Sequence, residues 1–94
     1  MSEEKYRFLI QEEEVWKIKI FSRSEAQNWI LGNPKAILIR FAVVGDGCNM
    51  PFDTKEEAFF EAKEHGGKVS IIKPKDSVYE GLPPEAISLM YASL

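Results

Sequence analysis

The sequence has 94 residues, of which 45% are hydrophobic and 29% are charged. This length fits one domain with one core, and this balance of residues argues against wholesale disorder. The net charge of −3 disfavours nucleic acid as a partner, because phosphate binding favours a basic surface.

Cys48 is the only cysteine, so no internal disulfide can form, which fits a reducing compartment. The start of the chain, Met1–Lys5, is acidic and polar, unlike a signal peptide. The longest apolar stretch, Ala36–Val44, is shorter than the roughly 20 residues that span a bilayer. We therefore expect a cytoplasmic protein that does not enter a membrane.

Two strands are predicted at the start of the chain. Aromatic and branched residues indicate a strand at Tyr6–Ile10. Apolar and basic residues alternate in Val15–Phe21, which predicts a half-buried strand joined to the first by a short hairpin loop. The apolar members are Trp16, Ile18 and Ile20, and the basic members are Lys17 and Lys19.

A helix is predicted next, because Ser22 and Glu25 have the spacing of a capping box. Ala26, Trp29 and Ile30 would share its apolar face. Gly32 is expected to end the helix in a left-handed cap, with Pro34 preventing its continuation.

The middle of the chain is predicted to hold a buried strand and a second helix. Ala36–Val44 is apolar on both faces except at Arg40, which is typical of a central strand covered on both sides. Gly45–Gly47 ends this strand. Asp53–Glu56 is a second capping signal, with Thr54–Glu57 as the same signal shifted by one residue. The helix should run to about Glu64, before two glycines.

A further strand is predicted at Lys68–Lys73, and Pro83–Pro84 opens a last helix. This helix carries no charged side chain from Ala86 to Leu94, although a solvated helix normally does. Its expected apolar stripe consists of Ile87, Met90, Tyr91 and Leu94, with Leu89 well off the stripe.

We predict an α+β fold with one small mixed sheet, the element order ββαβαβα, and helices packed on the sheet. Two successive strand–helix–strand crossovers favour parallel neighbours. Ala36–Val44 would then be central, flanked by Val15–Phe21 and Lys68–Lys73. If both crossover helices lie on one face, the C-terminal helix or a second subunit must cover the other.

The alternative is a ferredoxin-like βαββαβ core with an extra N-terminal strand and a C-terminal helix. It requires a turn at Asp46–Gly47 and a strand at Cys48–Phe52. Pro51 argues against it, because proline removes a ladder hydrogen bond from an interior strand. The alternative would also place the most apolar strand at an edge of the sheet.

A ligand-binding hypothesis follows from the parallel arrangement, in which the loops after three strands meet at one sheet edge. Basic side chains and the free N–H groups of a helix start can hold a small anion there. The glycine-rich loop lacks the Gly-Lys-Ser/Thr ending of a nucleotide-binding loop. The hypothetical ligand-binding residues are Arg23, Gly45, Asp46, Gly47, Cys48, Asn49 and Lys73.

The function that the sequence favours is a non-catalytic interaction module that forms a homodimer or binds a small protein partner. The strand is apolar on both faces and the C-terminal helix lacks charged side chains, so both are expected to be buried against another surface. Phe60 points away from the predicted buried face of the second helix. The hypothetical interface residues are Phe60, Ile87, Leu89, Met90, Tyr91 and Leu94.

No catalytic site, metal site or cofactor is expected. Cys48 and His65 are single members of their kinds, and a four-ligand metal site would need carboxylates as well. Lys17, Lys19 and Arg40 suggest a basic sheet face, but the aromatic signature of single-stranded RNA binders is missing.

Overall fold

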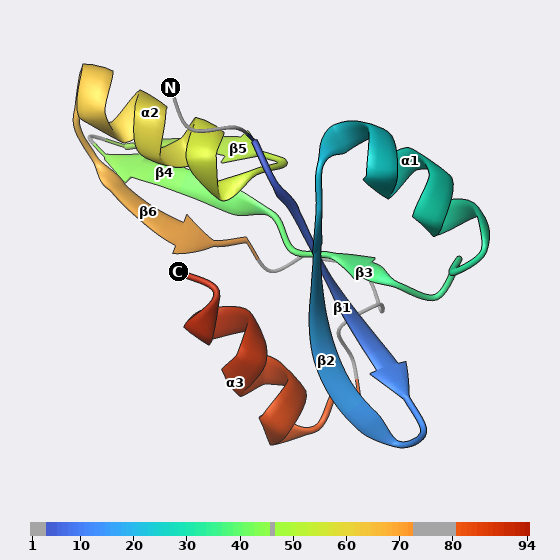
Figure 1. Ribbon diagram of the computed structural model, residues 1–94. Helices are drawn as coiled ribbons and strands as arrows, with labels where there is room; N and C mark the ends of the chain where they lie inside the picture. Colours follow the sequence, from blue (N-terminus) through green and yellow to red (C-terminus); the bar gives the residue numbers. More distant parts are fainter. Residues whose placement is uncertain (1–3, 46, 73–80) are drawn as a thin grey trace.

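The computed structural model describes residues 4–45, 47–72 and 81–94, and its strands form two three-stranded sheets (Figure 1). The first sheet has the order β2-β1-β3 and the second has the order β5-β4-β6. The strands are β1 (Tyr6–Glu12), β2 (Val15–Phe21), β3 (Ile37–Leu38), β4 (Phe41–Gly45), β5 (Cys48–Phe52) and β6 (Lys68–Ile71). The helices are α1 (Arg23–Leu31), α2 (Lys55–His65) and α3 (Pro84–Ala92).

The predicted α+β class is confirmed, but the predicted single sheet with parallel neighbours is wrong. Each of the four strand pairs is antiparallel, and β2 and β6 lie in different sheets instead of flanking one central strand. The ferredoxin-like alternative is also wrong as a single sheet. Its hairpin is nevertheless present, because β4 pairs with β5 in the register Gly45↔Cys48.

The apolar run Ala36–Val44 is divided between the two sheets. Its first part is β3, which pairs with β1, and its last part belongs to β4, the centre of the second sheet. Ile39, at the crossover between them, is completely buried. The run is apolar, except at Arg40, because the chain passes through the core at this point, and not because one strand is covered on both faces.

Pro51 is compatible with the strand β5 because β5 is an edge strand of the second sheet. Proline is tolerated at an edge, where the missing N–H can face away from the neighbouring strand. The sequence argument against a strand at Cys48–Phe52 failed because it placed Pro51 in the interior. The most apolar strand, β4, is not at an edge either.

The first sheet confirms the alternation predicted for Val15–Phe21. Trp16 and Ile18 pack against the core, whereas Ile20 remains 54% exposed. The opposite face of the sheet carries an aromatic cluster with α1, in which the ring of Trp29 lies 4.8 Å from that of Phe21 and 5.2 Å from that of Phe8.

One core joins the two sheets and two of the helices. Both β1 and β4 contribute fully buried residues to it, α2 contributes Ala58, and α3 contributes Ala86 and Met90. Helix α2 packs on the second sheet, whereas α3 packs against β2 and β1 (Figure 1). The fully buried side chains of largest volume are Phe41, Leu9, Ile39 and Thr54.

The helix starts are confirmed, but one helix end differs from the prediction. The capping box of Ser22 and Glu25 is formed in both directions, and the Thr54 side chain accepts a hydrogen bond from the Glu57 N–H. Gly32, at the end of α1, has a φ of −92° and is not left-handed. Gly66, at the end of α2, has a φ of +81° and uses the conformational freedom of glycine.

Gly67 is expected to tolerate alanine poorly. Its φ is +117°, and an added Cβ would lie 2.8 Å from Val43 Cγ1 and 3.0 Å from the Val44 carbonyl oxygen. Gly47 also has a positive φ, +79°, but a Cβ there would meet nothing within 4 Å. Both substitutions carry a backbone penalty of about 1–2 kcal/mol. Chemical denaturation should show Gly67→Ala to be the more destabilising, and equal losses would contradict the close approach.

Candidate functional site

The predicted ligand-binding loop is the hairpin between β4 and β5. Gly45 ends β4, Gly47 lies in the turn, and Cys48 and Asn49 begin β5. The neighbouring Asp46 and the predicted basic residue Lys73 lie outside the described residues. The hairpin packs against the end of α2, since a Cβ on Gly45 would lie 3.3 Å from the Gly67 Cα.

Arg23 lies near the opposite end of α2 from this hairpin. Its charge acts on Glu57, in the first turn of α2, whereas Gly45 lies beside Gly67, after the last turn. An 11-residue helix is about 16 Å long, so the described members of the hypothetical ligand site do not meet. The expected shared edge is absent because Arg23 follows a strand of one sheet and Gly45 ends a strand of the other.

Helix α3 divides the predicted interface residues between its two sides. Met90 is 3% exposed and Leu89 packs against the core, so these two residues hold the helix on its own chain. Ile87, Tyr91 and Leu94 face outward, with 38%, 45% and 41% of their surfaces exposed. The predicted stripe is therefore divided, because Met90 faces the core together with Ala86 and Leu89, whereas Ile87, Tyr91 and Leu94 face outward.

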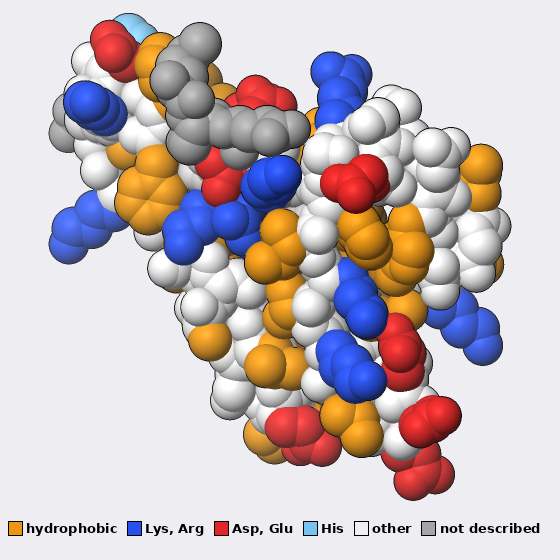
Figure 2. Space-filling model, in the orientation of Figure 1, with side chains coloured by type: hydrophobic (Ala, Val, Ile, Leu, Met, Phe, Trp, Pro, Cys, Tyr) orange, Lys and Arg blue, Asp and Glu red, His pale blue; other side chains and the backbone are white. Residues whose placement is uncertain are grey.

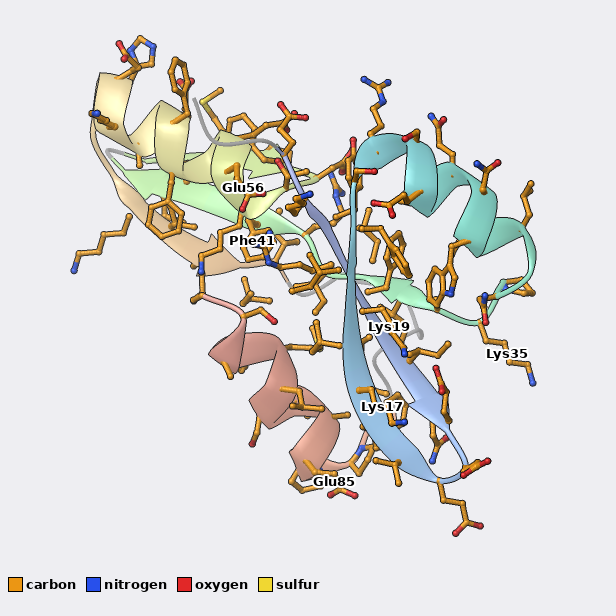
Figure 3. The ribbon with its side chains drawn as sticks, viewed as in Figure 1. Lys17, Lys19, Lys35, Phe41, Glu56 and Glu85 are labelled. Carbon is orange, nitrogen blue, oxygen red and sulfur yellow. The ribbon has the colours of Figure 1, made fainter. Side chains whose placement is uncertain are left out.

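The outward side of α3 combines three large apolar residues with two small ones. Ile87, Tyr91 and Leu94 follow helical spacing, and Ser88 and Ala92 are exposed beside them. The only charged residue of the helix is Glu85, in its first turn (Figure 3). We name the surface of these five residues the outer α3 face.

A second exposed apolar area lies on α2, where Phe60 is 54% exposed and Phe59 is 48% exposed. Both residues line an open hollow of about 830 Å³, the α2 hollow, together with Phe52. Phe60 was predicted from the sequence as an interface residue, whereas Phe59 and Phe52 were not. Two adjacent phenylalanines on a charged helix cannot both face the core, and this pattern could have indicated an exposed aromatic residue. The charged residues that line the hollow are Glu4, Arg7, Lys55, Glu56, Glu57, Glu61, Lys63 and Glu64.

Glu56, one of the residues that line this hollow, connects α2 to β1 through hydrogen bonds (Figure 3). Arg7 donates two hydrogen bonds to its carboxylate, of 3.2 Å from Nη1 to Oε1 and 2.8 Å from Nη2 to Oε2. The Lys5 backbone N–H donates a third, of 2.8 Å. Burial raises the pKa of Glu56, but the hydrogen bonds from Arg7 and Lys5 outweigh burial, and its pKa lies below the ordinary value.

Glu57, the next residue, has the opposite shift. Burial raises its pKa, and so do a hydrogen bond with the Glu4 side chain and the negative charges of Glu4 and Asp53. The charge of Arg23 compensates only in part. The mouth of the α2 hollow near Glu57 is therefore a place where a positive charge would be favoured.

The basic residues of the predicted sheet face do not form a shared platform. Lys17 and Lys19 lie on one side of β2 (Figure 3), but both approach Glu12, at 3.8 Å and 3.6 Å between their charged atoms. Arg40 donates a 2.9 Å hydrogen bond to Asp53 instead. Each of these cations thus has a carboxylate of its own chain beside it. On the face shown in Figure 2, basic side chains are interspersed with acidic ones and do not form one continuous patch.

The described ranges, 4–45, 47–72 and 81–94, contain no group of three or more His, Cys, Asp and Glu side chains that could hold a metal ion. Within these ranges no helix has the length and apolar character needed to cross a membrane. Comparison of the chain with protein-family models, curated proteins and solved structures finds no match.

Proposed function

We propose that this chain is a protein-interaction module that binds a second copy of itself through the outer α3 face. The observation that carries the proposal is that α3 has large apolar residues on an exposed side as well as on the side that faces its own core. One side packs on its own chain through Ala86 and Met90, and the other exposes Ile87, Tyr91 and Leu94. A helix that is apolar all round is normally buried on all sides.

A second copy is the occupant that fits this face. In a two-fold dimer the same surface meets itself, so a charged face would bring like charges together, whereas the outer α3 face carries none. The small residues Ser88 and Ala92 let a facing helix approach closely, while Ile87 and Tyr91 form a ridge four residues apart along the helix.

The proposed role is non-catalytic, and it rests on binding alone. A cytoplasmic location is consistent with it, because a single cysteine suits a reducing compartment. Neither an anion site nor a nucleic-acid surface is proposed, since the described residues of both hypotheses lie apart or beside carboxylates of the chain.

Light scattering after size-exclusion chromatography tests self-association. The unchanged chain should elute with twice the mass of 10.7 kDa, and Ile87→Lys should shift it to the monomer by placing charges in the contact. The matched control is Leu31→Lys, which adds the same charge at an 81% exposed leucine of α1 and should leave the dimer intact. A chain that stays monomeric up to about 1 mM would refute the proposal, because weaker association falls below specific binding.

A further inference from the structure

The α2 hollow is separate from the outer α3 face, and three phenylalanines lie in it among charged residues. It is an open surface depression of about 830 Å³, so it offers a contact to a partner's side chains and does not enclose a small molecule. Phe52 reaches it from β5, and Phe59 and Phe60 reach it from α2. Two adjacent phenylalanines that are each about half exposed, 48% and 54%, offer apolar surface to an incoming side chain.

The aromatic lining already accepts a positive charge from the chain itself. Lys55 Nζ lies 5.7 Å from the centre of the Phe59 ring, within the distance of a cation–π contact. A Lys or Arg side chain from a partner has the same chemistry. The neighbouring Phe60 is 54% exposed and offers aromatic surface of the same kind to a cation or an apolar group of a partner.

The charges that line the hollow are unbalanced. Arg7 and Glu56 neutralise each other through their two hydrogen bonds. The remaining lining residues are four glutamates, Glu4, Glu57, Glu61 and Glu64, and two lysines, Lys55 and Lys63. The described lining thus has an excess of negative charge at the same place as its exposed rings.

We infer that the α2 hollow binds a peptide segment of a protein partner in which arginine or lysine stands next to a bulky apolar residue. The apolar residue covers Phe59 and Phe60, and the basic residue faces the glutamates along the rim. An acidic partner would meet repulsion, and a purely polar one would leave the rings exposed. This inference does not depend on self-association, because α2 and α3 pack on different sheets.

Binding should depend on pH in one direction. The groups that act on Glu57 are Glu4, Asp53 and Arg23, together with its own burial. A basic side chain in the hollow stabilises the ionised form of Glu57, so peptide binding should release a proton. Affinity should therefore rise as the pH increases through the raised pKa of Glu57, and Glu57→Gln should flatten this dependence.

The probe is a short peptide with the repeat glycine–arginine–leucine, titrated into the full chain and followed by amide NMR shifts and calorimetry. Saturable shifts are expected along α2, at Phe52 and at Glu4. Two matched peptides, one with glutamate in place of arginine and one with serine in place of leucine, should each bind more weakly. Equal binding of either matched peptide would overturn the proposed chemistry.

Substitutions in the chain locate the site. Phe60→Ser should weaken binding about tenfold or more, because it removes apolar surface from the contact. Glu61→Gln should weaken it up to about fivefold, as expected for an exposed charge pair. The control Glu14→Gln removes the same charge from the distant β1–β2 turn and should leave affinity unchanged.

Two results would overturn the inference. Equal weakening by Glu14→Gln and Glu61→Gln would mean that the peptide responds only to net charge. Shifts located on α3 instead of α2 would mean that it binds the outer α3 face. Ile87→Lys, which tests self-association, should leave peptide affinity unchanged, so that failure of one proposal is distinguishable from failure of the other.

Discussion

Phe41→Ala is expected to lower the free energy of unfolding by about 3–5 kcal/mol, a large fraction of the roughly 5–15 kcal/mol that stabilises a domain. Phe41 is completely buried at the start of β4, immediately after the crossover between the sheets (Figure 3). It pairs with Phe52 on one side and Ile71 on the other, so its ring fills space at the centre of the second sheet. Removing it leaves a cavity that this backbone cannot readily close.

The matched control is Phe60→Ala, which removes the same atoms from a side chain that is 54% exposed. This variant should change stability by well under half as much, because its ring is only partly withdrawn from water. Urea denaturation of the two variants compares their free energies of unfolding, provided that these free energies depend on urea concentration with the same slope. Equal losses would mean that Phe41 is not the central packing residue of the second sheet.

Arg7→Met is expected to lower the free energy of unfolding by about 2–3 kcal/mol, somewhat less than the loss of a fully buried ion-pair partner. The side chains of Arg7 and Glu56 are only 14% and 17% exposed, and they join β1 to α2 across the chain. Methionine retains much of the apolar stem of arginine. It removes both hydrogen bonds that Arg7 donates to the Glu56 carboxylate and leaves the one from the Lys5 N–H.

Arg40→Met is the control for this ion pair. Arg40 and Asp53 form a hydrogen bond of similar length, 2.9 Å, but their side chains are 46% and 51% exposed. Exposed pairs contribute about 0–1 kcal/mol, so this variant should lose clearly less stability than Arg7→Met. A double-mutant cycle with Glu56→Gln separates the Arg7–Glu56 interaction from other effects of each change. A coupling energy near zero would refute the structural role of the pair.

The same pair predicts how stability changes with pH. Because the pKa of Glu56 is lower in the folded chain, its contribution is present above the unfolded pKa, near 4.5, and is lost as the pH falls through the folded pKa. Glu57 has the opposite slope, since its raised pKa favours folding at low pH. The difference between the unchanged chain and Arg7→Met isolates Glu56, and it should shrink on acidification below pH 4.5. A difference that stays constant would contradict this account.

Patterns confined to short segments were predicted well. The alternation around Ile18 predicted which side of β2 faces the core, and Ser22 with Glu25 predicted the start of α1. The candidate interface was predicted only in part. Sequence periodicity placed Ile87, Tyr91 and Leu94 on one side of a helix, but it did not reveal that this side faces outward, because Met90 and Leu89 are equally apolar.

The sequence by itself determined the α+β class, the three helices, the capping residues at the starts of α1 and α2, and the absence of charged side chains from Ala86 to Leu94. Only the tertiary structure decided that Ala36–Val44 is shared between two sheets, with Ile39 buried where the chain crosses from one to the other. The physical reason is that an apolar run indicates that its residues are buried, but not which strands or helices bury them. A strand covered on both faces and a chain that crosses a core need the same residues, and long-range pairing alone distinguishes them.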